Sequence, residues 1–359
     1  MKKYIVIGLI VLVGAAFIIG PMLKGSEGDD PTEDQAPATF AFEENLATKW
    51  NQLVPISIDV NMKDVKKLQL IYNDSVFKTW TAPKGKLTFQ LDAGYFGLGT
   101  RSIVLLSTLN DGTTYTDNRM IRVLSDVKPA IWIAEIASTL PHLSTSFTQG
   151  LEFNEGVLYE GTGQLGQSMV AQVNLNSGEI IKKMGLDGTY FGEGITILKD
   201  KLYQLTWQNQ KCFVYNKSTF AIEKDLTYTG EGWGLCNDGA SLIMSDGTER
   251  IVFRNPETFQ IERTIEVYDD RGPISKLNEL EYIDGLIYAN IWMTNSAVVI
   301  QPENGKVIAV IDGSVLIKEG QNGGDVMNGI AFNAKTSKTY MTGKNWSKLF
   351  EVRFKKPVV

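Results

Sequence analysis

The residue with the clearest capacity for chemistry is Glu193, which lies between glycines in the segment Phe191-Gly192-Glu193-Gly194. A carboxylate acts as a general acid or base near neutral pH when its surroundings raise its pKa. Segments of the same form recur through the C-terminal part of the chain, and the residue in the place of Glu193 is polar or amphipathic in each: Gln149, Trp233, Asn278 and Asn328. Asn and Gly are common in turns for backbone reasons, but Glu and Trp are not. We therefore predict that these positions face one central site, with Glu193 as its acid–base residue.

Tryptophans and a lysine belong to the same predicted site. Trp207 and Trp292 each follow the polar position of their own repeat by 14 residues. A single Trp is more often a core residue, but the equal offset favours a pocket wall that also includes Trp233. Tryptophan faces hold cations and exclude water. The predicted pocket thus encloses one carboxylate and one lysine, Lys344, from the last repeat.

The elements that position these residues are predicted to be short strands in repeated units of four. The glycine after the polar position (Glu279 in one copy) recurs at 150, 194, 234, 279 and 329, so the spacings are 44, 40, 45 and 50 residues. Repeats of about 40–50 residues with four strands each are typical of a β-propeller. The last copy ends near Val352 after three strands, and an extra strand at 131–136 precedes the first copy. We predict five blades, with the extra strand closing the ring. An open solenoid or a second sandwich leaves both irregularities unexplained.

The composition argues against several kinds of function. The net charge is −6 and the pI about 5.1, so the chain has no basic field for nucleic acid. The single histidine, His142, disfavours a zinc hydrolase site and a Ser-His-Asp triad, and we assign it to the surface or to packing. Cys212 and Cys236 are predicted as small buried core residues, with one disulfide at most. We predict no catalytic metal and no cofactor.

The N-terminal part of the chain lies outside the repeats. Residues 1–25 have a basic start followed by an uncharged run that is long enough to span a bilayer as a helix. We predict an uncleaved anchor with the rest of the chain exported to the periplasm or cell envelope; a cleaved signal peptide is the alternative. Residues 26–38 are acidic and predict a disordered linker. Alternating runs over 39–126 predict an immunoglobulin-like β-sandwich that acts as a spacer or docking module. The propeller takes 127–359.

The repeated region resembles a known enzyme family. The similar segments are Ser146-Phe147-Thr148-Gln149-Gly150-Leu151-Glu152, Tyr159-Glu160-Gly161-Thr162-Gly163, Phe191-Gly192-Glu193-Gly194-Ile195, Leu202-Tyr203-Gln204-Leu205-Thr206-Trp207 and Leu277-Asn278-Glu279-Leu280-Glu281-Tyr282. These segments are similar to those of the plant and bacterial glutaminyl-peptide cyclotransferases, and the likeness covers about Ile131 to Lys355. The resemblance implies a five-bladed propeller, unrelated to the zinc-dependent animal enzymes. It also implies an enzyme that converts N-terminal glutamine of peptides or proteins to pyroglutamate and releases ammonia.

The resemblance also implies roles for particular residues. Glu193 takes the place of the central carboxylate, and Lys344 is the second predicted catalytic residue, with Lys348 as a nearby alternative. The predicted substrate-binding residues are Phe147, Gln149, Phe191, Trp207, Trp233, Asn278, Trp292 and Asn328. Lys344, Gln149 or Asn278 is expected to hold the carboxamide oxygen as negative charge develops. We expect a monomer that acts on peptides or proteins with N-terminal Gln.

Two other functions are compatible with a propeller. The first is a protein of the cell envelope that only binds a peptide or another ligand, because propellers host many unrelated functions. The second is a metal-dependent lactonase, which needs several carboxylate and Asn ligands around one ion. The ring of polar positions offers only Glu193 as a carboxylate, although Glu279 is adjacent in sequence to Asn278.

Overall fold

The structure is a computed structural model and describes residues 36–356. Strands are the main regular structure of these residues, with a 3₁₀ turn at Ala93–Phe96 and a short helix, α1 (Ser314–Gly320). The predicted all-β class is therefore confirmed. The predicted anchor and most of the linker lie outside the described residues, and no helix in the described part is long and apolar enough to cross a membrane.

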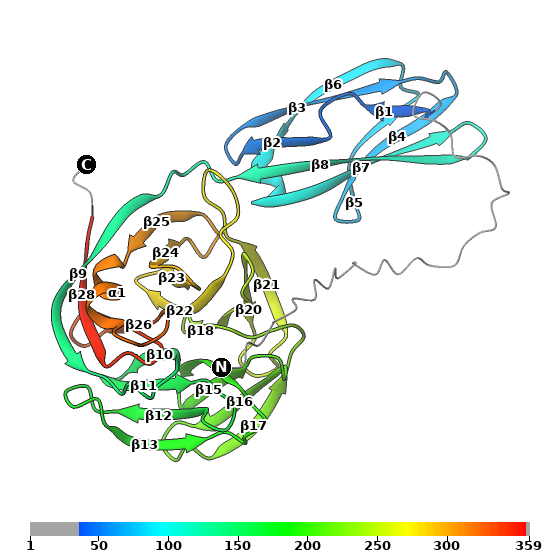
Figure 1. Ribbon diagram of the computed structural model, residues 1–359. Coiled ribbons are helices and arrows are strands. Elements are labelled where there is room, and N and C mark those ends of the chain that lie inside the picture. The colour runs from blue at the N-terminus through cyan, green and yellow to red at the C-terminus, as the bar shows by residue number, and fades with distance from the viewer. Residues whose placement is uncertain (1–35, 357–359) are drawn as a thin grey trace, which may run out of the picture.

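The N-terminal part is built from two sheets that enclose one apolar core (Figure 1). Strand β7 (Gly99–Leu109) alternates buried with more exposed residues along its length, and β8 (Thr114–Leu124) does so near its end, as expected for a sheet with one face on a core. Side chains such as Ile56, Leu70 and Ile103 fill the space between the sheets. One sheet has the order β1 (Ala38–Phe40), β3 (Leu53–Val60), β6 (Gly85–Asp92), and the other has the order β2 (Asn45–Lys49), β8 (Thr114–Leu124), β7 (Gly99–Leu109), β4 (Val65–Tyr72), β5 (Ser75–Thr81).

The C-terminal part arranges its sheets around a common centre (Figure 1). The first strand of each repeat is buried along most of its length, and β14 (Gly192–Leu198) along all of it, because neighbouring sheets pack against these strands. Three sheets have four antiparallel strands each: β10 (Thr148–Asn154), β11 (Val157–Thr162), β12 (Met169–Val173), β13 (Ile180–Gly185); β14 (Gly192–Leu198), β15 (Lys201–Thr206), β16 (Lys211–Asn216), β17 (Ile222–Thr227); and β18 (Leu235–Asn237), β19 (Leu242–Ser245), β20 (Arg250–Arg254), β21 (Ile261–Glu266).

The last two repeats share one eight-stranded sheet through β9 (Ala130–Pro141). The extra strand predicted at 131–136 lies in β9 and pairs antiparallel with the last repeat, for example Ile136 with Val352. It also pairs in parallel with β25, a connection that the repeat pattern did not predict. The other strands are β22 (Leu277–Ile283), β23 (Leu286–Ile291), β24 (Ser296–Ile300), β25 (Val307–Asp312), β26 (Met327–Asn333), β27 (Lys338–Gly343) and β28 (Lys348–Lys355).

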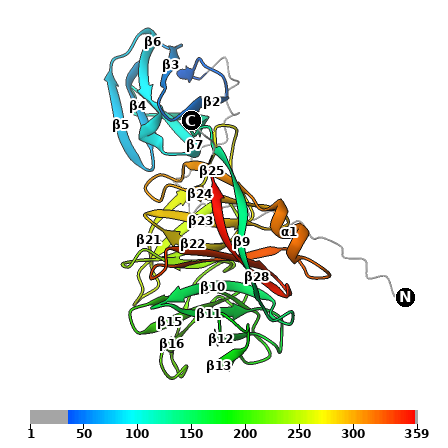
Figure 2. The same cartoon turned by 90° about the vertical axis from the view of Figure 1, so that its left-hand side faces the viewer.

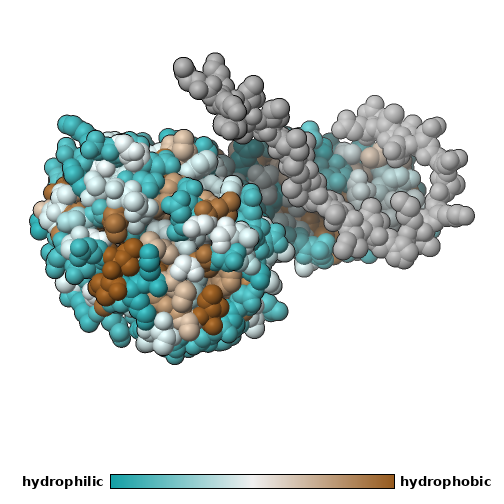
Figure 3. Space-filling model, turned by 60° about the horizontal axis from the view of Figure 1, so that its bottom comes forward, coloured by the Kyte–Doolittle hydropathy of each residue, from teal (hydrophilic) through white to brown (hydrophobic). Residues whose placement is uncertain are grey.

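The sandwich sits beside the ring near β25 and β21 (Figures 1 and 2). Arg101 forms a salt bridge of 2.6 Å with Glu266 across this junction. Lys306 pairs with Asp126 at 2.7 Å and lies over the Trp50 ring. The face of the ring seen in Figure 3 is mostly hydrophilic with small, separate apolar patches.

Candidate active site

Four of the predicted site residues stand at irregularities in the first strands of their repeats. The pairing of the first and second strands shifts register between Thr148 and Gly150, and again between Gly192 and Ile195. The same shift occurs at Leu277/Leu280 and at Met327/Ile330. A bulge leaves a residue unpaired and redirects its side chain. Gln149, Glu193, Asn278 and Asn328 all lie within these bulges.

The glycine that follows each polar position has a packing reason. A Cβ on Gly194 would lie 2.5 Å from the backbone nitrogen of Leu235, and one on Gly234 would lie 1.9 Å from the carbonyl oxygen of Asn278. The first strands of adjacent sheets therefore approach too closely for a side chain. In the fourth repeat Glu279 replaces glycine, and its carboxylate accepts hydrogen bonds from the backbone N–H groups of Leu151 and Ile330.

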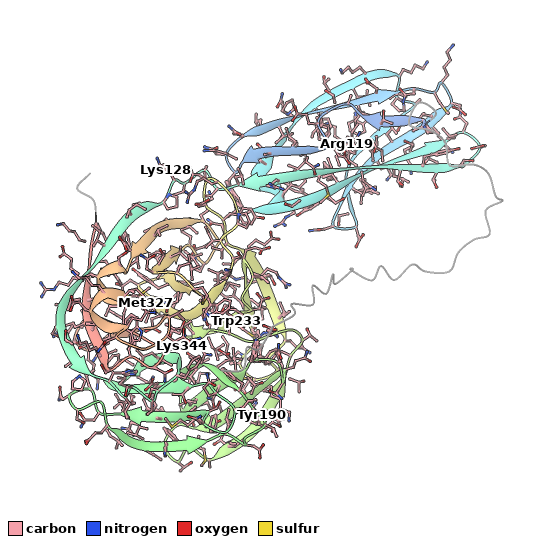
Figure 4. The ribbon with its side chains drawn as sticks, viewed as in Figure 1. Arg119, Lys128, Tyr190, Trp233, Met327 and Lys344 are labelled. Atoms are coloured by element: carbon pink, nitrogen blue, oxygen red, sulfur yellow. The ribbon has the colours of Figure 1, made fainter. Side chains whose placement is uncertain are left out.

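These positions open on one cavity of about 270 Å³ at the centre of the ring. Figure 4 shows Trp233 and Lys344 toward the middle of the ring. Every predicted site residue except Asn328 lines the cavity, and Met293 and Asp325 line it in addition. Asn328 is fully buried behind Gln149, and its Nδ2 donates to Thr148 O (3.0 Å) and to Gln149 Oε1 (3.4 Å). Its observed place is behind the pocket rather than on the pocket surface.

Glu193 is buried at the cavity wall with one side-chain hydrogen bond. Gln149 Nε2 donates to Glu193 Oε1 at 3.1 Å, and Gln149 is itself held by Asn328. Burial raises the pKa of Glu193 well above its ordinary value of 4.5; Lys344 opposes this rise and Glu231 adds to it. A carboxyl with such a pKa exchanges protons closer to neutral pH than an exposed one does.

Lys344 supplies a positive charge to the same cavity. It is only 4% exposed, and its Nζ lies 4.9 Å from the centre of the Phe147 ring. Burial lowers the pKa of Lys344 below 10.5, while Glu193 and Asp325 oppose this change. The nearby alternative Lys348 does not line the cavity, and its Nζ donates to Glu319 O instead.

The aromatic wall is held by a carboxylate that sequence reasoning missed. Glu231 Oε2 accepts the indole N–H of Trp207 at 2.8 Å and that of Trp233 at 2.9 Å. Burial alone raises the pKa of Glu231, but bonds from Gln208, Trp233 and Trp207 outweigh it and hold the pKa below 4.5. The available signal was its place in Glu231-Gly232-Trp233, two residues before a site residue.

The aromatic rings contact one another edge to face. Trp233 and Trp292 have centroids 5.5 Å apart at 89°, and Phe191 contacts Trp207 at 5.8 Å. Gly247 makes room for this wall, because a Cβ there would lie 2.6 Å from the Trp233 ring. Edge-to-face pairs are favourable geometries, so the wall is rigid before any substrate enters.

Asn278 offers an unused acceptor to the cavity. Its side chain is 2% exposed, and its Oδ1 has no hydrogen-bond partner among the described residues. An unpaired buried polar atom is costly unless a ligand or water satisfies it.

Met293 and Asp325 complete the lining and were not predicted: Met293 follows Trp292 where the second repeat has Gln208, and Asp325 lies in a loop of the longest repeat.

His142 is buried, in agreement with a packing role, and it joins two loops of the site. Its Nδ1 donates to Trp346 O (2.8 Å) and its Nε2 to Glu160 Oε1 (3.1 Å). Burial lowers the pKa of His142, but Glu160 outweighs it and the pKa lies above 6.5. Glu160 also accepts from Ser146 and Thr148, which flank Phe147. The charged pair therefore ties the Phe147 loop to the loop that carries Lys344. Cys212 and Cys236 are both free and buried, as predicted.

The ring of sheets and its central pocket define a β-propeller-like protein with a buried carboxylate and a lysine inside an aromatic wall. Residues 105–354 match the model of the glutamine cyclotransferase family, and the chain belongs to this family. A glutaminyl-peptide cyclotransferase of Arabidopsis thaliana is 37% identical over 230 residues, which are 62% of this chain and 71% of that protein.

A solved structure supports the same relationship. The crystal structure of Myxococcus xanthus glutaminyl cyclase matches with a TM-score of 0.61 and 36% identity, covering 64% of this chain and 100% of the other. The resemblance stated from the motifs, and the enzyme class that it implies, are confirmed. The family match begins within β7, so most of the sandwich lies outside it.

Proposed function

We propose that the protein cyclises the N-terminal glutamine of peptides or proteins to pyroglutamate, with Glu193 as general base and then general acid. The observation that carries this proposal is a buried carboxyl, raised in pKa, in an aromatic cavity. Membership of the family and the names of the two relatives support the reaction type.

The reaction needs one proton to move between two nitrogens. The substrate α-amine attacks Cδ of its own side-chain carboxamide in its neutral form, and Glu193 takes the proton that the α-nitrogen loses as the ring closes. A C–N bond forms to the α-nitrogen, and the bond to the amide nitrogen breaks as Glu193 returns the proton and ammonia departs. Because the attack is intramolecular, orientation in the pocket provides a large part of the rate.

The surrounding residues have separate roles in this scheme. Lys344 faces the cavity as a cation and stabilises the oxyanion that forms at the carboxamide. The unpaired Oδ1 of Asn278 accepts an N–H of the substrate. Gln149 fixes the orientation of Glu193 through its own hydrogen bond. The tryptophans surround the N-terminal residue and exclude water.

The proposed mechanism uses no metal ion. Within residues 36–356 no group of three or more His, Cys, Asp or Glu side chains is arranged to hold one. The Glu193–Lys344 arrangement provides both the base and the positive charge that the reaction needs. A chelator that abolished activity, restored by added zinc or calcium, would contradict this part of the proposal.

We further infer a five-bladed propeller behind an immunoglobulin-like sandwich. The eight-stranded sheet divides into β22–β25 and a second set in which β9 completes β26–β28. The N-terminal segment is proposed to anchor an exported, monomeric protein in the membrane, on the basis of its sequence alone. Cell fractionation tests the anchor, and a wholly soluble product would refute it.

The direct test is ammonia release from a Gln-initiated dipeptide, with the cyclised product followed by mass. A matched dipeptide that begins with Asn is the control, because its shorter side chain would require a strained four-membered ring. Release of ammonia from the Gln dipeptide alone is expected. A folded protein that binds the dipeptide without ammonia release would favour the binding-only alternative.

A further inference from the structure

A second cavity lies against the third sheet of the ring and the 229–231 loop, which borders the tryptophan wall of the central pocket. It has a volume of about 200 Å³, and its lining includes Arg250, Arg254, Asp246 and the 229–231 loop. Arg250 and Arg254 both lie on β20, four residues apart, so their side chains leave the same face of the sheet. Met244 and Val252 form the apolar part of the lining.

The repeats show that Arg254 stands where an apolar residue is usual. In each sheet the pairing of the third and fourth strands shifts register at one place, and β28 shifts register in the same way where it pairs with β9. The residue just after this shift is Val173, Tyr215, Arg254, Ile300 or Val352, and all of them are buried. Arg254 is therefore a charge at a position that the fold fills with apolar side chains.

The residues around Arg254 leave part of its hydrogen-bonding capacity and its charge unpaired. It is 5% exposed, its Nη1 donates to the neutral carbonyl of Phe259, and its Nε has no partner among residues 36–356. The rings of Tyr228 and Phe259 lie against the guanidinium. Neither Arg254 nor Arg250 forms a salt bridge with any residue in 36–356. A buried cation without a counter-ion is costly.

The carboxylates in the cavity wall are already engaged. Both oxygens of Glu231 accept bonds from the indoles and from Gln208. Asp246 Oδ1 accepts from Thr248 within its own turn. The unused donors thus belong to the guanidiniums, whose planar fork suits a carboxylate or a phosphate. A cavity of about 200 Å³ with two acids also in its wall suits a small anion rather than a polyanion.

We propose that this cavity binds one small oxyanion, a carboxylate or a phosphate, between the guanidiniums of Arg254 and Arg250. The site is separate from the proposed cyclisation chemistry, and its test does not depend on that activity. Glu231 belongs to both the cavity and the tryptophan wall, so the two sites share a boundary.

The test is titration of the full-length protein with inorganic phosphate and, separately, with acetate, at constant ionic strength with chloride as the reference. Calorimetry should show one saturable site, and Tm should rise and level off with ligand concentration. Arg254→Ile introduces the residue that the fourth repeat already carries, so it should fold and should weaken binding roughly tenfold or more. Arg250→Gln should weaken it less. The arm that saturates at lower concentration identifies the ligand class.

A matched control is Arg263→Gln on the adjacent strand, since Arg263 stacks on Phe253 and donates to Pro302 O, outside the cavity. It should bind like the wild type. Salts also raise Tm without a site, but such a rise does not saturate and is the same in all variants. Absence of saturable binding in the wild type, or equal binding by Arg254→Ile, would overturn the proposal. If Arg254→Ile fails to fold, Arg254→Lys is the second variant, because it keeps the positive charge but lacks the planar guanidinium. Undiminished anion binding by Arg254→Lys would also contradict the proposal.

Discussion

Replacing Glu193 by Gln separates proton transfer from geometry in the central pocket. Glu193 has one side-chain hydrogen bond, from Gln149 Nε2 at 3.1 Å. A glutamine presents an amide oxygen at the same place, so this bond and the position of the side chain are kept. The variant lacks only a group that can take and return a proton.

The expected loss follows from that separation. One positioned acid–base group contributes typically ~10²–10⁴-fold to the rate, which corresponds to about 3–5 kcal/mol of activation free energy. Because orientation is retained, we expect kcat and kcat/KM to fall together by this factor. The variant should also lose the acidic limb of the pH profile. In the wild type this limb lies well above pH 4.5, because burial raises the pKa of Glu193 and the carboxyl must be ionised to act as a base.

The assay is ammonia release from a Gln-initiated dipeptide between pH 5 and 9, with Tm measured in parallel. Because the pKa of Glu193 is higher in the folded than in the unfolded state, the folding stability of the wild type falls as pH rises above 4.5. Glu193→Gln lacks this carboxyl and should be at least as stable as the wild type at pH 7. Glu281→Gln is the matched control, because Glu281 is a buried carboxyl with a raised pKa that does not line the pocket. A Glu193→Gln variant that retained more than about a tenth of kcat would refute the acid–base assignment.

Three further outcomes follow from the described contacts. Glu231→Leu removes the single oxygen that accepts both indole N–H groups, so KM for the dipeptide should rise roughly tenfold with a smaller change in kcat; an unchanged KM would contradict this role. His142→Phe leaves the buried Glu160 unpaired and should lower the free energy of unfolding by about 3–5 kcal/mol, partly restored by adding Glu160→Gln, as urea unfolding would show. Burial raises the pKa of Glu152 from 4.5 to about 7, so the folded state retains its proton longer and wild-type stability should fall across that window, by on the order of 3 kcal/mol. Glu152→Gln should flatten the dependence of unfolding free energy on pH, measured from unfolding curves at each pH. An unchanged pH dependence would contradict this role of Glu152.

The repeat allowed much of the site to be predicted from the sequence. A propeller places equivalent positions of successive repeats around one centre, so Gln149, Glu193 and Asn278 converge whatever their own propensities are. The bulges at these positions and the close approach behind Gly194 and Gly234 explain why the motif has its form. For the same reason, Trp207 and Trp292, which have equal offsets in their repeats, both line the cavity.

Other features depend on contacts between repeats and were not predictable from spacing. Glu231 acts on tryptophans of two different sheets, and Asp325 enters the pocket from a loop of the longest repeat. Asn328 obeys the repeat but lies behind Gln149, because Gln149 occupies the space in front of it. A repeat pattern gives the position of a backbone, whereas the direction of a side chain depends on what its neighbour leaves free.

Departures from the repeat are therefore the most informative residues in this chain. Glu193 is the carboxylate among amides and an indole at the polar position, and it lies in the central pocket with a raised pKa. Gly247 leaves the space that the Trp233 ring fills. Arg254 is the charge among valine, tyrosine and isoleucine at the register shift of the third strands, and its Nε is unpaired beside a cavity. Packing alone favours the same residue type at each equivalent position. A costly exception must then be offset by an interaction specific to its own sheet, and for Arg254 that interaction is the proposed anion.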